Sequence, residues 1–357
     1  MTADPKRFAK ILFGQTLVRS GLWKRALRGW AERGAVIILT YHRVIEKWDS
    51  ALEYSQPGMV VTGRTFERQI AILKKHFEIV SLGTLLEDEH FAGRPRCVIT
   101  FDDGWRDNYD RAFPILRRHS VPATIFLSTD FIGTDRAFWH TELMYLLTRA
   151  RWSSGLDQER AFRGYPGPVR DHLQRLASLD GTAAAHDIDP LIEAVKALCD
   201  EDAIEALLHL LTNAAGIRRP LIDGRKFFLD WDQVRTLASA GIEIGSHGCS
   251  HQILTRLPEA QAHDELTRSK TEIERRIGRE VKHFAFPNDE GSDALVAAAA
   301  KAGYETACLG GHDVDRRQFG IRFLQRVGMH EGVCGDGRSF DEALLYSWLF
   351  RTPKVSA

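Results

Sequence analysis

Short apolar runs rich in β-branched residues alternate along this chain with longer segments in which apolar residues recur every three or four positions. The short runs predict strands, and the spaced segments predict helices. The predicted strands are Val36–Tyr41, Phe77–Ser81, Cys97–Phe101, Ala123–Ser128, Ile242–Gly245, His283–Phe286, Thr306–Leu309 and Phe323–Gly328. The predicted helices between them include Phe66–His76, Asn108–His119, Asp232–Ala240, Glu259–Ile277 and Ser292–Ala302. Strands and helices that take turns with short connections indicate a parallel sheet.

We therefore predict an α/β fold in which about seven strands close into a distorted (β/α) barrel. One interval, from about Trp139 to Phe228, shows no strand pattern and is too long for an ordinary loop. The predicted organisation is an N-terminal amphipathic helix over residues 1–34, followed by a barrel over residues 35–350. The barrel carries a helical insertion at about 139–228, for which we expect a role as a lid or substrate-binding element.

The N-terminal segment, residues 5–31, has apolar positions at helical spacing with Lys and Arg on the other face. A basic amphipathic helix of this kind either docks on the body of the protein or lies on an anionic membrane surface. The segment does not resemble a signal peptide, because Gly14 and Gln15 interrupt its apolar run. We expect a cytoplasmic protein, peripheral to the inner membrane if the second interpretation holds.

Composition and charge narrow the class of protein. Lys plus Arg equals Asp plus Glu at 48 each, so the net charge does not indicate a nucleic-acid partner. The five cysteines are odd in number and show no CxxC spacing. This pattern indicates neither a disulfide framework nor a cysteine zinc site.

Two adjacent carboxylates, Asp102 and Asp103, follow the predicted strand Cys97–Phe101 and precede Gly104. The carboxyl ends of parallel strands form the active face of a barrel, so both side chains should lie there. One carboxylate can then bind a cation while its neighbour handles a proton. The alternative is an ordinary Asp-Asp-Gly turn or a helix N-cap.

A second motif, His247 and His251, follows the predicted strand Ile242–Gly245. Two histidines four residues apart in a tight turn can direct both imidazoles at one ion. Together with Asp103 they supply the Asp and two His ligands of an open zinc site. Three protein ligands leave room for water and substrate, which is the pattern of a catalytic metal rather than a structural one.

At these residues the chain resembles the polysaccharide deacetylases, carbohydrate esterase family four, with a nodulation-type chitooligosaccharide deacetylase homology domain. The motifs are Thr100–Gly104, Ser246–His251 and, as a third, Phe284–Pro287. The resemblance covers roughly Val36–Ser128 and Leu229–Val327. It implies that Asp102 is the general base and that Asp103, His247 and His251 bind a divalent metal, usually Zn²⁺. It also implies an oxyanion site at the backbone N–H after Pro287, that of Asn288.

Two histidines compete for the role of general acid. A branch of the family that acts on exported or biosynthetic polysaccharides carries a Tyr-His pair at the first strand, and His42 fits that pattern. His330 is the nearest match to the late Leu-x-His motif of other members, and we favour His42 over it. The third motif departs from the family pattern at Asn288 and Asp289, and the family's charged Arg is not evident upstream of it. Asp289 either orients a catalytic group or caps the next helix.

The favoured function is a metal-dependent hydrolase that removes N-acetyl groups from an N-acetylated sugar, oligosaccharide or lipid-linked glycan in cell envelope polysaccharide biosynthesis. One alternative is an amidohydrolase that cleaves another linear or cyclic C–N bond. The other is a catalytically weak, glycan-binding barrel. The presence of Asp102, Asp103, His247 and His251 favours an enzyme over a binding protein.

Overall fold

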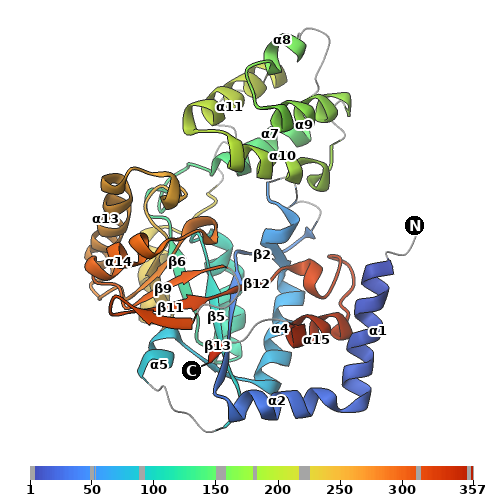
Figure 1. Ribbon diagram of the computed structural model, residues 1–357, viewed down its shortest axis with the longest axis vertical. Helices are drawn as coiled ribbons and strands as arrows, with labels where there is room; N and C mark the ends of the chain where they lie inside the picture. Colours follow the sequence, from blue (N-terminus) through green and yellow to red (C-terminus); the bar gives the residue numbers. More distant parts are fainter. Residues whose placement is uncertain are drawn as a thin grey trace. The chain divides into compact units, whose positions relative to one another are not determined.

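The computed structural model describes residues 5–48, 52, 54–87, 93–149, 158–179, 183–216, 226–310, 315–351 and 355–356 (Figure 1). The chain forms two compact units. The first comprises Met1–Glu46, Val61–Thr134 and Phe228–Ala357, and the second comprises Lys47–Val60 and Asp135–Phe227. The sequence pattern places an insertion at about 139–228, and it gives no sign that Lys47–Val60 belongs to the same unit.

The first unit is built on one mostly parallel sheet. Its parallel strands are β1 (Ala35–Tyr41), β4 (Glu78–Val80), β5 (Arg96–Phe101), β6 (Thr124–Leu127), β7 (Glu243–Ser246), β8 (His283–Ala285), β9 (Thr306–Leu309), β11 (Ile321–Gln325) and β12 (Val327–Gly328). The order is β10-β11-β9-β8-β7-β6-β5-β1-β12, with β4 beside β5. Seven of the eight predicted strands are confirmed, and the eighth, Phe323–Gly328, is divided into β11 and β12. Four short strands were not predicted, namely β2 (Arg43–Ile45), β3 (Val60–Thr62), β10 (Asp315–Gln318) and β13 (Val355–Ser356).

The sheet closes on itself near Arg326. This residue alone separates β11 from β12, yet the two strands pair at opposite ends of the sheet. Leu324 of β11 pairs with β9, whereas Val327 of β12 pairs with Leu39 of β1. One stretch of chain therefore joins both ends of the sheet, and the predicted α/β barrel is confirmed.

Helices surround this sheet. Figure 1 shows the strands gathered in the middle of the unit, with α13 and α14 on one side and α4 on another. Their bounds are α4 (Gly63–His76), α5 (Leu82–Glu87), α6 (Phe113–Arg118), α12 (Trp231–Ser239), α13 (Glu259–Ile277), α14 (Asp293–Lys301) and α15 (Glu342–Arg351). β1 and β5 are buried at every position, as expected of strands covered on both faces.

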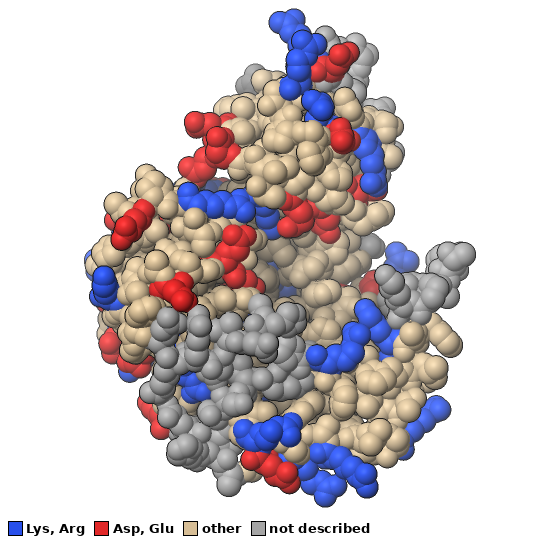
Figure 2. All heavy atoms as spheres, viewed as in Figure 1, with Lys and Arg blue, Asp and Glu red and all other residues tan. Residues whose placement is uncertain are grey.

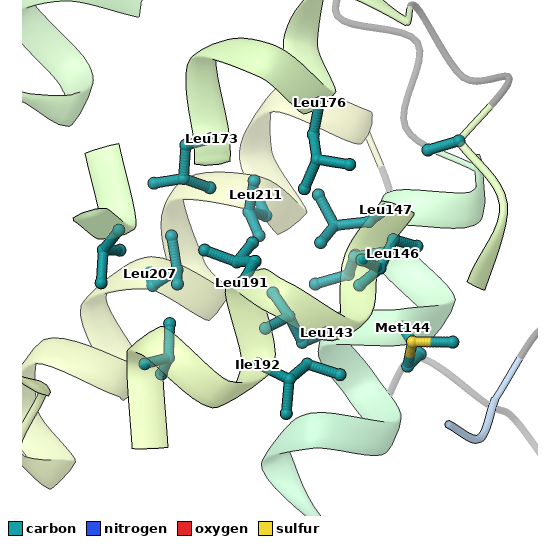
Figure 3. Packing of buried hydrophobic residues seen from close by; sticks show 14 of the residues in the cluster. Leu143, Met144, Leu146, Leu147, Leu173, Leu176, Leu191, Ile192, Leu207 and Leu211 are labelled. Carbon is teal, nitrogen blue, oxygen red and sulfur yellow. The ribbon is translucent and has the colours of Figure 1, made fainter. Parts of the chain in front are cut away.

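The second unit is helical in its described residues, as predicted. It contains α7 (Trp139–Arg149), α8 (Gln158–Phe162), α9 (Gly167–Ser178), α10 (Ala185–Leu198) and α11 (Glu201–Ala215). Figure 3 shows leucines and isoleucine from α7, α9, α10 and α11, among them Leu143, Leu173, Leu191 and Leu207, pointing into one core. This unit therefore has a hydrophobic core of its own.

The N-terminal segment forms two helices where the pattern predicts one, α1 (Pro5–Ser20) and α2 (Leu22–Glu32). Gly21 separates them with a φ of 71°, a left-handed conformation that ends a helix. Trp23 and Trp30 of α2 are buried within the first unit. Among the described residues, no helix is both long enough and apolar enough to cross a bilayer.

α1 packs closely on α15. A Cβ atom on Gly14 would overlap the backbone carbonyl of Ala343, so only glycine allows the two helices to approach this far. One helical turn further on, Leu17 is buried. The aromatic rings of Phe13 and Phe350 meet edge to face, with centroids 5.9 Å apart. The structure therefore shows one side of α1 docked on the body of the protein.

We predict that Gly14→Ala destabilises the protein, because the added methyl group forces α1 away from α15. Overpacking of this kind costs about 1–3 kcal/mol. The free energy of unfolding in urea measures the effect. Gly29→Ala in α2 is the matched control, because its Cβ would meet only the Arg33 side chain, at 3.3 Å. Equal stability of the two variants would contradict the packing.

Candidate active site

Four strands end at the same edge of the sheet and carry the candidate residues. His42 follows β1, and Asp102 and Asp103 follow β5. The register aligns these two ends, because Tyr41 pairs with Phe101. His247 follows β7. The fourth strand, β8, leads into Pro287 and Asn288. The barrel therefore brings residues far apart in the sequence to its carboxyl edge, as expected for parallel strands.

Asp103, His247 and His251 form a compact group. Nε2 of His251 lies 3.1 Å from Oδ1 of Asp103, and Nε2 of His247 lies 3.5 Å from the same oxygen. One ligand atom from each residue lies within 4.8 Å of the others. Asp103 Oδ1 is buried and accepts no hydrogen bond of normal geometry among the described residues. A buried carboxylate oxygen that faces two imidazole nitrogens is suited to share a cation with them.

The surrounding contacts hold the side chains of this group in place. Nδ1–H of His247 donates to the carbonyl of Ala285 at 2.8 Å, which leaves Nε2 unprotonated and directed at Asp103. The indole N–H of Trp105 donates to Oδ2 of Asp103 at 2.7 Å. Trp105 is fully buried and stacks on Phe228, so the carboxylate is held firmly. One carboxylate and two imidazoles are the donor set of an open zinc site, and the residues present fit that ion.

Backbone strain gathers at this edge. Asp103 and His251 adopt φ angles of 74° and 61°, and Asn288 and Asp289 adopt 58° and 55°. Each non-glycine residue in this conformation costs about 1–3 kcal/mol, so the surrounding structure must enforce it. Of the six such residues in the described chain, four therefore belong to the candidate site.

Glu265 of α13 fixes the loop between the two histidines. Its buried carboxylate accepts hydrogen bonds from the backbone N–H groups of Cys249 and Ser250, at 2.6 and 3.0 Å. It also accepts one from the Ser250 hydroxyl, at 2.7 Å. Gly248 has a φ of 79°, and a Cβ there would lie 2.8 Å from this carboxylate. Cys249 is buried by these contacts and does not point to the ligand cluster as a fourth group.

Asp102 forms a buried ion pair with Arg326. The guanidinium donates to both carboxylate oxygens, at 2.6 and 2.8 Å, and also to Asp289 at 3.0 Å. Asp289 therefore contacts Arg326 and is not the helix cap, since Ser292 caps α14 by accepting from the N–H of Leu295. Arg326 was not predicted as a site residue, because the arginine of the family pattern was expected upstream of the third motif. A signal was present, since Arg326 is a charged residue within a predicted strand.

The charges around the site set its protonation states. Burial raises the pKa of Asp102, but the charge and hydrogen bonds of Arg326, together with the charges of His247 and His42, hold this pKa below its usual range. Burial also raises the pKa of Asp103, but His251, with the charges of His42 and His247, more than offsets that effect and lowers this pKa. Burial lowers the pKa of His247 despite both carboxylates. Near neutral pH the two carboxylates are ionised and His247 is neutral, which is the state that binds a cation.

His42 is held by the segment that follows the two aspartates. Asn108 donates from Nδ2 to the His42 carbonyl at 2.7 Å, and it begins a π-helical turn, Asn108–Ala112. Asp107 accepts from Arg43 and from the N–H of Val44, both at 2.9 Å. π-helical turns are frequent at functional sites. The position of the His42 backbone is therefore fixed from both sides.

The two candidate general acids, His42 and His330, lie near each other. The charge of protonated His42 influences the carboxyls of Asp102 and Asp103. Burial, and then the charge of His42, lowers the pKa of His330. Nδ1 of His330 accepts a hydrogen bond from the N–H of Gly332 at 3.2 Å. His330 thus lies near His42.

The structure also shows where the expected oxyanion residues lie. Pro287 is buried, whereas Asn288 is exposed and donates from its side chain to Glu290 at 2.7 Å. Its side chain is thus engaged away from the ligand cluster, and only its backbone N–H remains a candidate for the expected role.

Comparisons with known proteins agree with the motifs. A family model described as polysaccharide deacetylase matches residues 92–153 and 185–307, just over half of the chain. A poly-β-1,6-N-acetyl-D-glucosamine N-deacetylase of Staphylococcus epidermidis is 34% identical over 113 residues, 29% of this chain and 39% of that protein. A putative polysaccharide deacetylase of Bacillus subtilis is 51% identical over 39 residues, 11% of this chain and 14% of that protein. The matches span well under two thirds of these relatives.

Solved structures share the fold. A Streptococcus pyogenes deacetylase in complex with acetate has a TM-score of 0.52 at 14% identity, and the match covers 84% of this chain and 94% of that one. A de-N-acetylase from Aggregatibacter actinomycetemcomitans has a TM-score of 0.51 at 16% identity, covering 88% and 99%. At such low identity the likeness extends to the barrel fold alone.

We predict that Arg326→Met destabilises the protein by about 3–5 kcal/mol at neutral pH, because it leaves the Asp102 carboxylate buried without its partner. Urea unfolding measures the loss. Arg268→Met is the control, because Arg268 forms an exposed pair with Asp130 and should contribute about 1 kcal/mol or less.

The pH dependence of the Arg326→Met variant gives a second readout. In the wild type the lowered pKa of Asp102 stabilises the fold above its ordinary value of 3.8, and this stabilisation is lost as the pH falls. In the variant the charge and hydrogen bonds of Arg326 are lost, so burial raises this pKa against only the charges of His247 and His42. The difference in free energy of unfolding between wild type and variant should therefore become smaller toward acidic pH. A difference that does not change with pH would contradict a stabilising ion pair.

Proposed function

The chain belongs to the polysaccharide deacetylase family, and we propose that it hydrolyses N-acetyl groups of an N-acetylated sugar or polysaccharide intermediate with a bound divalent metal ion. The observation that carries the proposal is the convergence of Asp103, His247 and His251 on one point, beside the ion-paired carboxylate of Asp102. Zn²⁺ suits this donor set best. The chemistry that such an ion supplies is polarisation of the acetyl carbonyl and a lowered pKa of nearby water.

In this proposal Asp102 takes the proton of the attacking water. Its carboxylate is ionised at neutral pH and held in place by Arg326. Because its pKa is low, Asp102 by itself is a weak base. The proton transfer would therefore depend on the lowered pKa of water that a metal ion at the neighbouring ligands would supply. A C–O bond forms, the C–N bond breaks, and the products are acetate and a free amine.

His42 is proposed to protonate the leaving amine. It follows β1 at the same edge as Asp102, and its charge acts on both aspartates. An imidazole has an ordinary pKa close to neutral pH, so it can supply this proton. The backbone N–H of Asn288 is proposed to donate to the developing oxyanion.

The substrate class follows from the relatives. The Staphylococcus epidermidis protein is named for poly-β-1,6-N-acetyl-D-glucosamine, and its match to this chain includes only part of that protein. We therefore propose β-linked N-acetylglucosamine oligomers as the first substrates to test, with a lipid-linked glycan as the next. Release of amine from small amides, with none from sugars, would favour an amidohydrolase instead.

We predict that His247→Ala lowers both the bound metal and the rate of acetate release. Asp102→Asn should keep the metal and lose the rate by about 10²–10⁴-fold, because it removes the proton acceptor and leaves the three candidate ligands unchanged. Metal analysis of the purified protein and acetate release from N-acetylglucosamine oligomers measure the two effects. His263→Ala, an exposed histidine of α13, is the matched control. A wild-type rate in Asp102→Asn would refute the proposed base.

The general acid can be identified from a pair of variants. We predict that His42→Gln lowers the rate on acetylated sugars by about 10²–10⁴-fold, while His330→Gln keeps most of it. An acid must be protonated, so its loss should also remove the fall in rate at alkaline pH. The deficit of His42→Gln should shrink on an aryl acetate, whose leaving group needs no proton. The reverse ranking of the two variants would assign the role to His330.

A further inference from the structure

α1 carries apolar side chains on two opposite sides. One side is occupied, since Gly14 and Leu17 face α15. On the other side Phe8 is 65% exposed and Leu12 is 54% exposed, and these residues lie one helical turn apart. Among the described residues, seven large apolar side chains are exposed, and five of them lie between Phe8 and Leu22. Exposed apolar surface is therefore concentrated on this helix and the start of α2.

The same segment is strongly cationic. Between Pro5 and Ala31 the sequence contains seven Lys or Arg residues and no Asp or Glu, although the whole chain is balanced at 48 of each sign. Lys10, Arg19, Lys24, Arg25 and Arg28 are exposed, and none of them forms an ion pair with a described residue. Figure 2 shows a mostly tan surface over α1, at the right of the view, with Lys and Arg beside it.

We propose that this surface, formed by the exposed side chains of α1 and α2, docks on an anionic lipid membrane. Apolar side chains that project from a cationic helix can enter the boundary between headgroups and acyl chains, while Lys and Arg contact lipid phosphates. Phe8, Leu12 and Leu22 are the inserting residues, and Lys24 and Arg25 are among the headgroup contacts.

The positive charge of this surface favours an anionic membrane over a second copy of the chain as its partner. In a symmetric dimer the same patch meets itself, so its five exposed described cations would face five others, and the segment contains no acid to pair them. An anionic bilayer supplies both a counter-charge and an apolar layer. The packing of Gly14 on Ala343 also holds α1 in its helical form before binding, so the membrane does not have to order it.

Vesicle flotation with the full chain tests the proposal. The protein should float with vesicles of phosphatidylcholine and phosphatidylglycerol in equal parts, stay behind with phosphatidylcholine alone, and be released by high salt. Lys24→Glu with Arg25→Glu should weaken partitioning by about tenfold or more. Phe8→Ser with Leu12→Ser should also weaken it about tenfold, because the loss of apolar area lowers insertion.

The matched controls are Leu198→Ser, an exposed leucine of α10, and Lys301→Glu, an exposed lysine of α14, which should bind like the wild type. An unchanged thermal transition shows that each variant is folded. Acetate release from a soluble oligosaccharide should stay at the wild-type level, so failure of the proposed chemistry would leave the vesicle result intact. Equal binding to both vesicle types, no binding, or self-association removed by Phe8→Ser with Leu12→Ser would each overturn the proposal.

Discussion

The buried ion pair between Arg326 and Asp102 is the interaction on which the candidate site depends. Arg326 lies between β11 and β12, at the point where the chain joins the two ends of the sheet. Closing the barrel therefore directs a guanidinium at the end of β5. Asp102 is 3% exposed, and without that charge burial would favour its neutral form. A neutral carboxyl group cannot take a proton from water. Arg326 therefore contributes both to the closure of the barrel and to the proposed role of Asp102 as a base.

Two adjacent aspartates receive different partners because the backbone turns between them. Asp102 continues the sheet, with its N–H donating to the Tyr41 carbonyl at 3.0 Å, and its carboxylate meets Arg326. Asp103 adopts a φ of 74°, so its carboxylate points to the two imidazoles instead. The conformation is strained, and the buried Trp105 hydrogen bond helps to hold it. Two like residues in sequence are thus given the environments of the proposed proton acceptor and the proposed metal ligand.

The sequence was informative where a feature is local and periodic. The apolar runs ending at Tyr41 and Phe101 predict both the strands and the edge at which their polar neighbours meet. Arg326 could not be paired in advance, because its partner lies 224 residues away and the pairing depends on barrel closure. The break at Gly21 was also missed, since an amphipathic pattern continues across a left-handed residue. Lys47–Val60 joins the helical unit through tertiary packing, such as Tyr54 on Tyr145, which no local pattern encodes.

The same reasoning about register bears on the general acid. β12 pairs with β1 through Thr40 and Gly328, so His42 and His330 lie at neighbouring strand ends. Their environments differ in one respect. Nδ1 of His330 accepts from the Gly332 N–H, and protonating that nitrogen would set two donors against each other. His330 is therefore held neutral by its own backbone contact, and burial together with the charge of His42 lowers its pKa further. These contacts count against His330 as the general acid and leave His42 as the proposed one.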